Sequence, residues 1–281
     1  MIPTRLGKFL RERTGISYGA LGALYEASRI RLAFESSEGL REYIFEGDEV
    51  WVDGKAFTGS SELLYAVLHK PVGVVSTVRS PDGTPDLAPY ISALGRGVFP
   101  VGRLDRDSSG LLLLCNDGDL AYALLSPTHH VEKQYLVVAQ SNHEFAARGL
   151  HSRLGSMVID GVKMRAKSVQ VFDRTASSCT LSIVLEEGKH RQIRKMCRQV
   201  GLSVRSLSRV RIGQIGLNDL PPGQLRRLSP DETAALWRAV GGHEEILRRQ
   251  LTALARSCAS RQALGKPHVR LEAWLRKHAT T

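Results

Sequence analysis

Charged residues of both signs occupy positions 103–107, directly before an unbroken run of leucines at 111–114. The run is bounded by Gly110 and by turn-forming residues at 116–118, a pattern typical of a short strand buried on both faces. The charged segment is then a loop that enters the sheet at its core. A carboxylate there, such as Asp105, is partly desolvated, needs a cationic partner to stay ionised, and can serve as an acid, a base or a nucleophile. From the spacing alone, a surface turn with solvated charges is the commoner arrangement.

Two later segments carry the other candidate chemical groups. The pattern at 132–137 predicts a strand with Lys133 and Tyr135 on one face, where a tyrosine is most often a core residue. Residues 188–196 lead into a predicted helix with basic side chains in its first turn, Arg194 among them. Because such charges oppose the helix dipole, a carboxylate or phosphates would favour them, although a solvated basic face is the commoner case.

Three stretches, in chain order, resemble the signature motifs of the pseudouridine synthases of the RsuA/RluA superfamily. They read Gly-Arg-Leu-Asp-Arg-Asp-Ser-Ser-Gly at 102–110, Glu-Lys-Gln-Tyr-Leu-Val at 132–137 and Gly-Lys-His-Arg-Gln-Ile-Arg-Lys-Met at 188–196. The resemblance implies that the chain isomerises uridine to pseudouridine in RNA, with no cofactor and no metal. It implies three catalytic residues, which are Asp105 as the nucleophile, Tyr135 as the ring beside the flipped uracil, and Arg194 as the partner of Asp105.

The resemblance leaves part of the chemistry open and extends to the RNA contacts. Whether the aspartate attacks the sugar carbon or abstracts the neighbouring proton cannot be read from the sequence. Lys-Pro-Val-Gly at 70–73 resembles the opening strand and turn of the family's sheet, and we interpret it as structural. The RNA contacts expected in the catalytic part of the chain are Arg103, Lys133, Lys189, His190, Arg191, Gln192, Lys195 and Arg209.

The composition favours a nucleic acid as the partner. The 281 residues include 39 Lys and Arg against 28 Asp and Glu, a formal net charge of +11. Such an excess suits a polyanion, although a generally basic proteome is a simpler source of it. The four cysteines form no Cys-x-x-Cys pair, and His129-His130 lacks a third ligand at metal spacing, so neither a metal site nor a disulfide framework is expected. With no segment of membrane-spanning length, the sequence predicts a cytoplasmic chain with no membrane partner, and we expect a monomer.

Residues 1–60 resemble the small alpha-L RNA-binding domain, which presents a basic helical face to folded RNA. The sequence departs from that family at Gly7, where an acidic residue is usual, and at 32–34, where a Val-Asn-Gly turn is usual. An amphipathic cap with solvated basic side chains is therefore the alternative interpretation. The phosphate contacts expected by position are Arg5, Lys8, Arg29 and Arg31.

The chain is divided by sequence into three parts. Residues 1–60 form the first domain, residues 61–237 the catalytic domain, and residues 238–281 a basic helical extension, with a short linker at 60–62. The extension is open to three roles, as an RNA clamp, a docking helix or a partly disordered tail. Many short strands joined by turns, with few helices, predict an α+β fold built on one mixed, mostly antiparallel sheet.

The N-terminal module and the motif at 126–135 are most similar to the RsuA branch, which implies a uridine of small-subunit (16S) ribosomal RNA as the target. Large-subunit (23S) ribosomal RNA is the alternative within the family, and a tRNA is the third. A different class of function is a non-catalytic protein that binds ribosomal RNA or assists ribosome assembly on the same scaffold. The retained Asp105, Tyr135 and Arg194 argue against that class, and no metal cluster or Ser-His-Asp arrangement supports a hydrolase.

Overall fold

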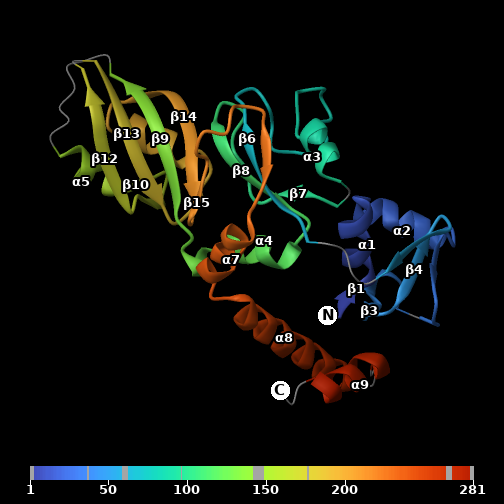
Figure 1. Cartoon of the computed structure of the whole chain (residues 1–281). Helices are drawn as coiled ribbons and strands as arrows, with labels where there is room; N and C mark the ends of the chain where they lie inside the picture. The colour runs from blue at the N-terminus through green and yellow to red at the C-terminus, as the bar shows by residue number, and fades with distance from the viewer. Residues whose placement is uncertain are drawn as a thin grey trace. The chain divides into compact units, whose positions relative to one another are not determined.

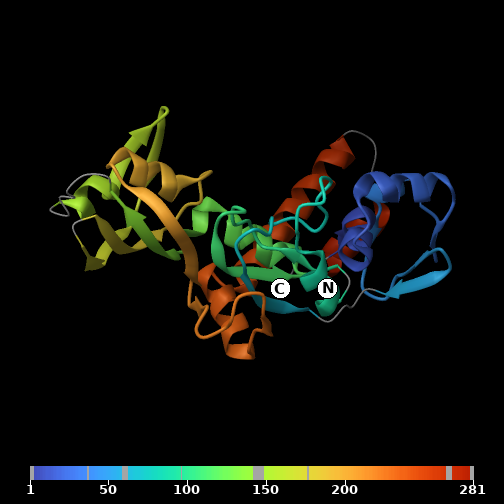
Figure 2. The same cartoon turned by 90° about the horizontal axis from the view of Figure 1, so that it is seen from above.

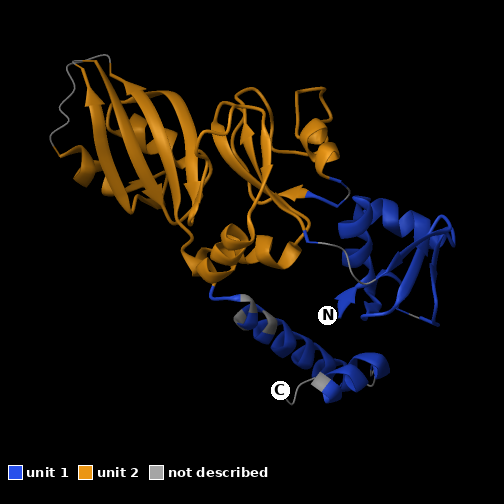
Figure 3. Cartoon of the chain, viewed as in Figure 1, with its two compact units in different colours: residues 1–63, 95–98, 241–281 blue, residues 64–94, 99–240 orange. Residues whose placement is uncertain are grey.

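The computed structural model describes residues 3–36, 38–58, 63–95, 97–141, 149–175, 177–263 and 268–278. The chain forms two compact units (Figure 3). The terminal unit comprises residues 1–63, 95–98 and 241–281, and the central unit comprises residues 64–94 and 99–240. The linker expected at 60–62 lies outside the described residues.

The central unit is built on one nine-stranded sheet, in the order β12-β13-β9-β14-β8-β6-β16, with β15 paired to β14 and β7 to β8 (Figure 1). All neighbours pair antiparallel except β14 and β8, so the expected mixed, mostly antiparallel α+β fold is confirmed. The strands of this sheet are β6 (Tyr65–Lys70), β7 (Phe99–Pro100), β8 (Ser109–Cys115), β9 (Lys133–Gln140), β12 (Ser168–Arg174), β13 (Ser178–Leu185), β14 (Ser203–Ile212), β15 (Ile215–Gly216) and β16 (Leu225–Arg227).

A separate hairpin and several helices complete the central unit. The helix that follows β8 begins at Asp117, whose carboxylate accepts hydrogen bonds from the backbone N–H groups of residues 119 and 120. The last helix of the unit begins with a capping box formed by Ser229 and Glu232. These elements are β10 (Ser156–Ile159), β11 (Val162–Arg165), α3 (Ala88–Leu94), α4 (Gly118–Leu125), the 3₁₀ turn at Pro127–His129, α5 (Leu150–Gly155), α6 (Gln192–Gln199) and α7 (Pro230–Ala239).

Strand β8 occupies the middle of the sheet, as its leucine run predicts. The side chains of residues 111–114 are at most 2% exposed. On one side β8 pairs with β6 along its whole length. On the other side it meets β14 through two residue pairs, Ser208 with Ser109 and Arg209 with Gly110, and this short parallel junction joins the two halves of the sheet seen in Figures 1 and 2. The charged loop before β8 is therefore attached to a strand that cannot shift without disturbing the core.

The parallel junction depends on the absence of a side chain at Gly110. Its φ is +104°, and a Cβ built there would lie 2.2 Å from the carbonyl oxygen of Arg209. We expect Gly110→Ala to lower the free energy of unfolding by about 3 kcal/mol or more, because both the backbone conformation and the strand spacing must change. Urea unfolding would measure this loss. Gly155→Ala is the control: with no atom within 4 Å of a Cβ at that position, it should change stability by less than about 1 kcal/mol.

The N-terminal part of the terminal unit has its own small core. The Ser17 hydroxyl caps the helix at 18–26 by accepting a hydrogen bond from the backbone N–H of residue 20. Leu6, Phe9, Leu10 and other apolar residues are buried between two helices and the strands. The elements are β1 (Thr4–Arg5), α1 (Leu6–Thr14), α2 (Tyr18–Glu26), β2 (Ile30–Leu32), the 3₁₀ turn at Gly39–Arg41, β3 (Tyr43–Ile44), β4 (Glu49–Val52) and β5 (Lys55–Thr58).

Two C-terminal helices, α8 (His243–Ala263) and α9 (Val269–His278), belong to this same terminal unit. Leu271 and Leu275, one helical turn apart on α9, are buried in a cluster with Tyr43 and Phe45. Residues 238–240 belong to the central unit, and residues 241–281 belong to the same compact unit as residues 1–63. No described helix is both long and apolar enough to cross a membrane.

Candidate active site

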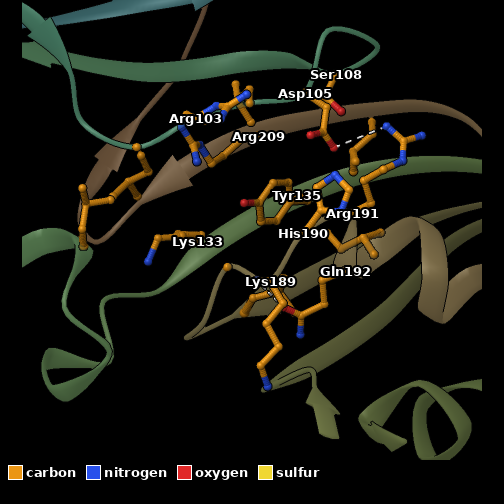
Figure 4. A pocket seen from close by; sticks show the side chains of 18 of the residues that line it. Arg103, Asp105, Ser108, Lys133, Tyr135, Lys189, His190, Arg191, Gln192 and Arg209 are labelled. Atoms are coloured by element: carbon orange, nitrogen blue, oxygen red, sulfur yellow. Dashed lines mark hydrogen bonds and ion pairs between the residues drawn. The ribbon is translucent and has the colours of Figure 1, made fainter. Parts of the chain in front are cut away.

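A pocket of about 530 Å³ opens in the central unit, in front of the loop that precedes β8 (Figure 4). Segments far apart in the sequence line it, among them the loop at 101–108, strand β9, residues 188–193 and strand β14, with leucines of β8, α4 and β13. A volume of this size accommodates a nucleobase with its ribose. The residues expected from the sequence that line it are Arg103, Asp105, Lys133, Tyr135, Lys189, His190, Arg191, Gln192 and Arg209.

The backbone around Asp105 is held by the turn that follows β6. The Ser76 hydroxyl accepts a hydrogen bond from the Leu104 N–H (3.0 Å) and donates one to the Leu104 carbonyl (2.8 Å). The Gly73 N–H donates to the Arg106 carbonyl (2.7 Å). Both sides of Asp105 are thereby fixed. Ser76 is not among the residues predicted from the sequence; the structure shows it 5% exposed, and its position directly after two valines is the sequence signal for a buried hydroxyl with hydrogen-bond partners.

The buried side chain of Lys70 stabilises the same turn through hydrogen bonds to its backbone. Its side chain is fully buried, and its ammonium donates to the carbonyls of Pro71 and Val74, each at 2.8 Å. Burial lowers the pKa of Lys70 to about 8, while the negative charges of Asp105 and Asp107 act in the opposite direction. The structural interpretation of residues 70–73 is therefore correct, since the ammonium faces backbone carbonyls inside the protein.

The cation beside Asp105 is Arg191, and the expected pairing of Arg194 with Asp105 is wrong. Arg191 Nη1 lies 3.6 Å from Asp105 Oδ2, and the same guanidinium bonds both oxygens of Asp107 at 3.2 and 2.8 Å. Arg194 donates to the Asp107 carbonyl (2.7 Å) and the Ser108 hydroxyl (3.4 Å). The reason is local. Arg191 has a left-handed φ of 53° just before α6, which turns its side chain towards the loop, whereas Arg194 lies within the first helical turn.

Asp107 organises the two arginines. The pKa of Asp107 is lowered, first by the hydrogen bond from Arg191 and then by the charge of Arg194, so this carboxylate is ionised at neutral pH. The pKa of Arg191 is raised by the same hydrogen bond. Asp107 therefore holds the Arg191 guanidinium in place, and that guanidinium also faces Asp105. Figure 4 shows the Asp105 carboxylate beside the Tyr135 ring, with the Arg191 contact as a dashed line.

The inner wall of the pocket is cationic. Tyr135 is 9% exposed on β9 and pairs in register with Arg209 on β14. Arg209 is 4% exposed and donates through Nε to the Leu111 carbonyl (2.7 Å), while Lys133 donates to the Val131 carbonyl (2.9 Å). Burial, followed by the charge of Arg209, lowers the pKa of Lys133 to about 8. At neutral pH this wall attracts a phosphate group.

Two other expected contacts are used inside the protein. Gln192 is 3% exposed, and its amide donates to the Arg165 carbonyl and to Glu187 while it accepts from the Lys189 N–H. The expectation that Gln192 binds RNA is therefore corrected to a structural role. Lys189 pairs with Glu187 (2.8 Å), and Lys195, outside the pocket lining, lies 3.7 Å from Asp160.

The four basic residues of the terminal unit that were expected to bind RNA also make contacts within the protein. Arg29 bonds both oxygens of Asp53, so its positive charge is largely neutralised. Lys8 lies 3.9 Å from Glu12. The other two basic side chains stand over aromatic rings, Arg5 at 3.9 Å from the centre of Tyr43 and Arg31 at 5.7 Å from the centre of Trp51.

Comparisons with known proteins identify the family to which a chain with this site is related. Residues 64–199 match the family model described as RNA pseudouridylate synthase. A chain of Mycobacterium leprae called an uncharacterised RNA pseudouridine synthase is 36% identical over 196 residues, covering 68% of this chain and 75% of that one. The chain belongs to the RNA pseudouridine synthase family. The motifs at 102–110, 132–137 and 188–196 of this synthase all contribute residues that line the pocket or contact the loop that borders it.

Two further relatives extend the match. The dual-specificity RNA pseudouridine synthase RluF of Salmonella typhi is 31% identical over 243 residues, covering 85% of this synthase and 80% of the relative. A solved structure titled as a pseudouridylate synthase superposes with a TM-score of 0.55 at 27% identity, covering 83% of this synthase and 99% of that chain. The enzyme is accordingly an isomerase that acts on uridine in RNA.

Proposed function

We propose that this synthase isomerises a uridine of ribosomal RNA with Asp105 as its catalytic carboxylate, and that small-subunit RNA is the target. The observation that carries the proposal is the pocket in which Asp105, its cation Arg191 and the Tyr135 ring lie together. The enzyme acts in the cytoplasm as a monomer, on a ribosomal subunit or an assembly intermediate.

The reaction exchanges one bond for another without an external reactant. The bond between the ribose C1′ and N1 of uracil breaks, the base turns, and C1′ bonds to C5. The C5 proton is lost and N1 gains one, so atoms and charges balance. Asp105 serves either as the nucleophile at C1′ or as the base for the neighbouring C2′ proton, with the Arg191 guanidinium beside it. We assign to the Tyr135 ring the support of the free base, and to its hydroxyl the late proton transfer.

The cationic wall helps to bring the base into the pocket. A target uridine must leave its stack, at a cost of about a few kcal/mol. Lys133 and Arg209 offset that cost by binding the phosphates that flank the flipped nucleotide, and Arg103 at the pocket mouth contributes a third cation. Arg194 keeps the backbone of residues 107 and 108 in place while the nucleotide enters.

The choice of target rests on the similarity of the N-terminal module and the 126–135 motif to the RsuA branch. Large-subunit RNA is the second candidate, because nearly all of the catalytic residues are shared between the branches. A single mapping experiment separates the two targets.

Pseudouridines should be mapped in all ribosomal RNAs and tRNAs from a strain that lacks this chain, and again after the wild-type chain or its Asp105→Asn variant is restored. We expect one small-subunit site to disappear, to return with the wild type and to stay absent with the variant. A lost site in large-subunit RNA or a tRNA would replace the proposed target. An unchanged map would contradict the proposed function and favour a role in assembly.

A further inference from the structure

The N-terminal part of the terminal unit has an unfavourable charge for an RNA-binding module. Residues 1–63 contain eight Lys and Arg but ten Asp and Glu, so this segment is slightly acidic although the whole chain carries +11. Residues 241–281 contain eight Lys and Arg against three Glu. The positive charge of the terminal unit therefore comes from its C-terminal segment. A surface that binds RNA phosphates needs such an excess.

The C-terminal helices are fastened to the acidic side of the N-terminal part. Arg261 on α8 bonds both carboxylate oxygens of Glu38, one of them at 3.2 Å, and this pairing lowers the pKa of Glu38. Arg270 on α9 bonds both oxygens of Asp48 at 2.7 and 2.8 Å. The imidazole Nε2 of His268 lies 2.9 Å from Glu42 Oε1.

Packing reinforces these contacts. The Arg270 guanidinium carbon lies 3.7 Å from the centre of the Phe34 ring and 4.7 Å from that of Phe45, so the cation stands between two aromatic faces. His268 meets the Tyr43 ring edge-on at 5.1 Å. Together with the buried leucines of α9, these contacts fix the helices on the N-terminal part and cancel negative charge that would repel RNA.

Glu38, Glu42 and Asp48 are thus paired with residues of the C-terminal segment. Other basic side chains of the two helices are exposed. Arg256 of α8 and Arg276 and Lys277 of α9 are exposed. We propose that these helices form an RNA-contacting surface, made of Arg256, Arg276 and Lys277, that binds phosphates of the substrate RNA other than those beside the flipped uridine. This inference rests on the proposed function and extends it, because it gives the C-terminal helices a direct part in substrate binding. The occupant is RNA because the three exposed side chains that make up the surface are all positively charged.

The test is a charge reversal in the full-length chain, Arg256→Glu with Arg276→Glu and Lys277→Glu. The matched control reverses three exposed basic residues of the central unit outside the pocket lining, Arg174, Arg227 and Arg238, and so has the same net charge. Binding and conversion are measured on a full-length ribosomal RNA transcript and on a short hairpin that contains the mapped uridine. Three lost phosphate contacts should weaken binding to the transcript by about tenfold or more at moderate salt and lower the salt slope by about 2 to 3.

The expected pattern is a loss on the transcript that exceeds the loss on the hairpin by at least about tenfold, with a much smaller loss in the control. Equal losses in both triple variants, or no loss in the first, would overturn the RNA-contacting surface. If the wild type binds the transcript but converts neither RNA, the proposed function fails while the binding comparison still decides the surface. Circular dichroism monitors folding, and the corresponding glutamine variants replace any reversal that unfolds the chain.

Discussion

Asp105→Asn is expected to lower the rate of uridine conversion by on the order of 10⁴-fold or more, which is the scale of losses when the reacting group of an enzyme is removed. An amide of the same shape can neither attack C1′ nor take a proton. The loop should keep its conformation, because Ser76, Gly73 and Lys70 hold it through the backbone rather than through this carboxylate. RNA affinity should therefore change little. Single-turnover conversion and filter binding on the same RNA measure the two effects separately.

The control for this substitution is Asp160→Asn. Asp160 is exposed in the turn between β10 and β11 with a φ of 52°, a conformation that asparagine adopts as readily as aspartate. The Asp160→Asn variant should therefore keep both the conversion rate and the RNA affinity near the wild-type values. If Asp105→Asn converts uridine at a rate within tenfold of the wild type, this carboxylate is not the catalyst. Loss of even an electrostatic contribution to catalysis would lower the rate by more than that.

The second large effect is expected at Arg194 rather than at the arginine that touches Asp105. Arg194 reaches the Asp107 carbonyl, the Ser108 hydroxyl and the Asp107 carboxylate from one planar guanidinium. A lysine places one ammonium at one of these points and leaves the others unbonded. We expect Arg194→Lys to lower the conversion rate by about 100-fold or more, because a shift of about 1 Å in the loop misplaces Asp105.

Arg191→Lys provides the comparison. Arg191 acts on Asp105 through charge at 3.6 Å, and a lysine keeps that charge, so we expect a loss of about tenfold or less. Measurement of kcat and KM for both variants, with thermal unfolding as a check, distinguishes the two roles. A greater loss at Arg191 than at Arg194 would show that the bidentate contact with Asp107, and not the backbone contacts to residues 107 and 108, positions the catalytic loop.

Sequence patterns predicted those parts of the structure that depend on local rules. The leucine run at 111–114 indicated the central strand, because a stretch apolar on both faces has no other place in a sheet. Serines that can satisfy the unpaired N–H groups of a helix start, such as Ser17 and Ser229, are local signals of the same kind. Lys133 and Tyr135 shared a face because strands alternate with a period of two, and the structure places both in the pocket lining.

The remaining features of the fold and the site depend on tertiary contacts that no local sequence pattern predicts. The order of Arg191 and Arg194 along the chain could not show which of them reaches Asp105, since the answer turns on one left-handed residue before α6. The resemblance at 188–196 placed Gln192 among the expected RNA contacts, but its amide is buried and bonded within the protein. The attachment of α9 to Tyr43 and Phe45 joins residues more than two hundred positions apart, and helical periodicity alone does not identify a partner face.

That attachment has a consequence during synthesis of the protein. The leucines that cover Tyr43 and Phe45 follow them by more than two hundred residues, so this cluster cannot form until α9 has been synthesised. Until then the nascent chain carries an exposed aromatic patch, a kind of surface that chaperones and proteases recognise. The completion of the terminal unit therefore reports that synthesis has passed α9.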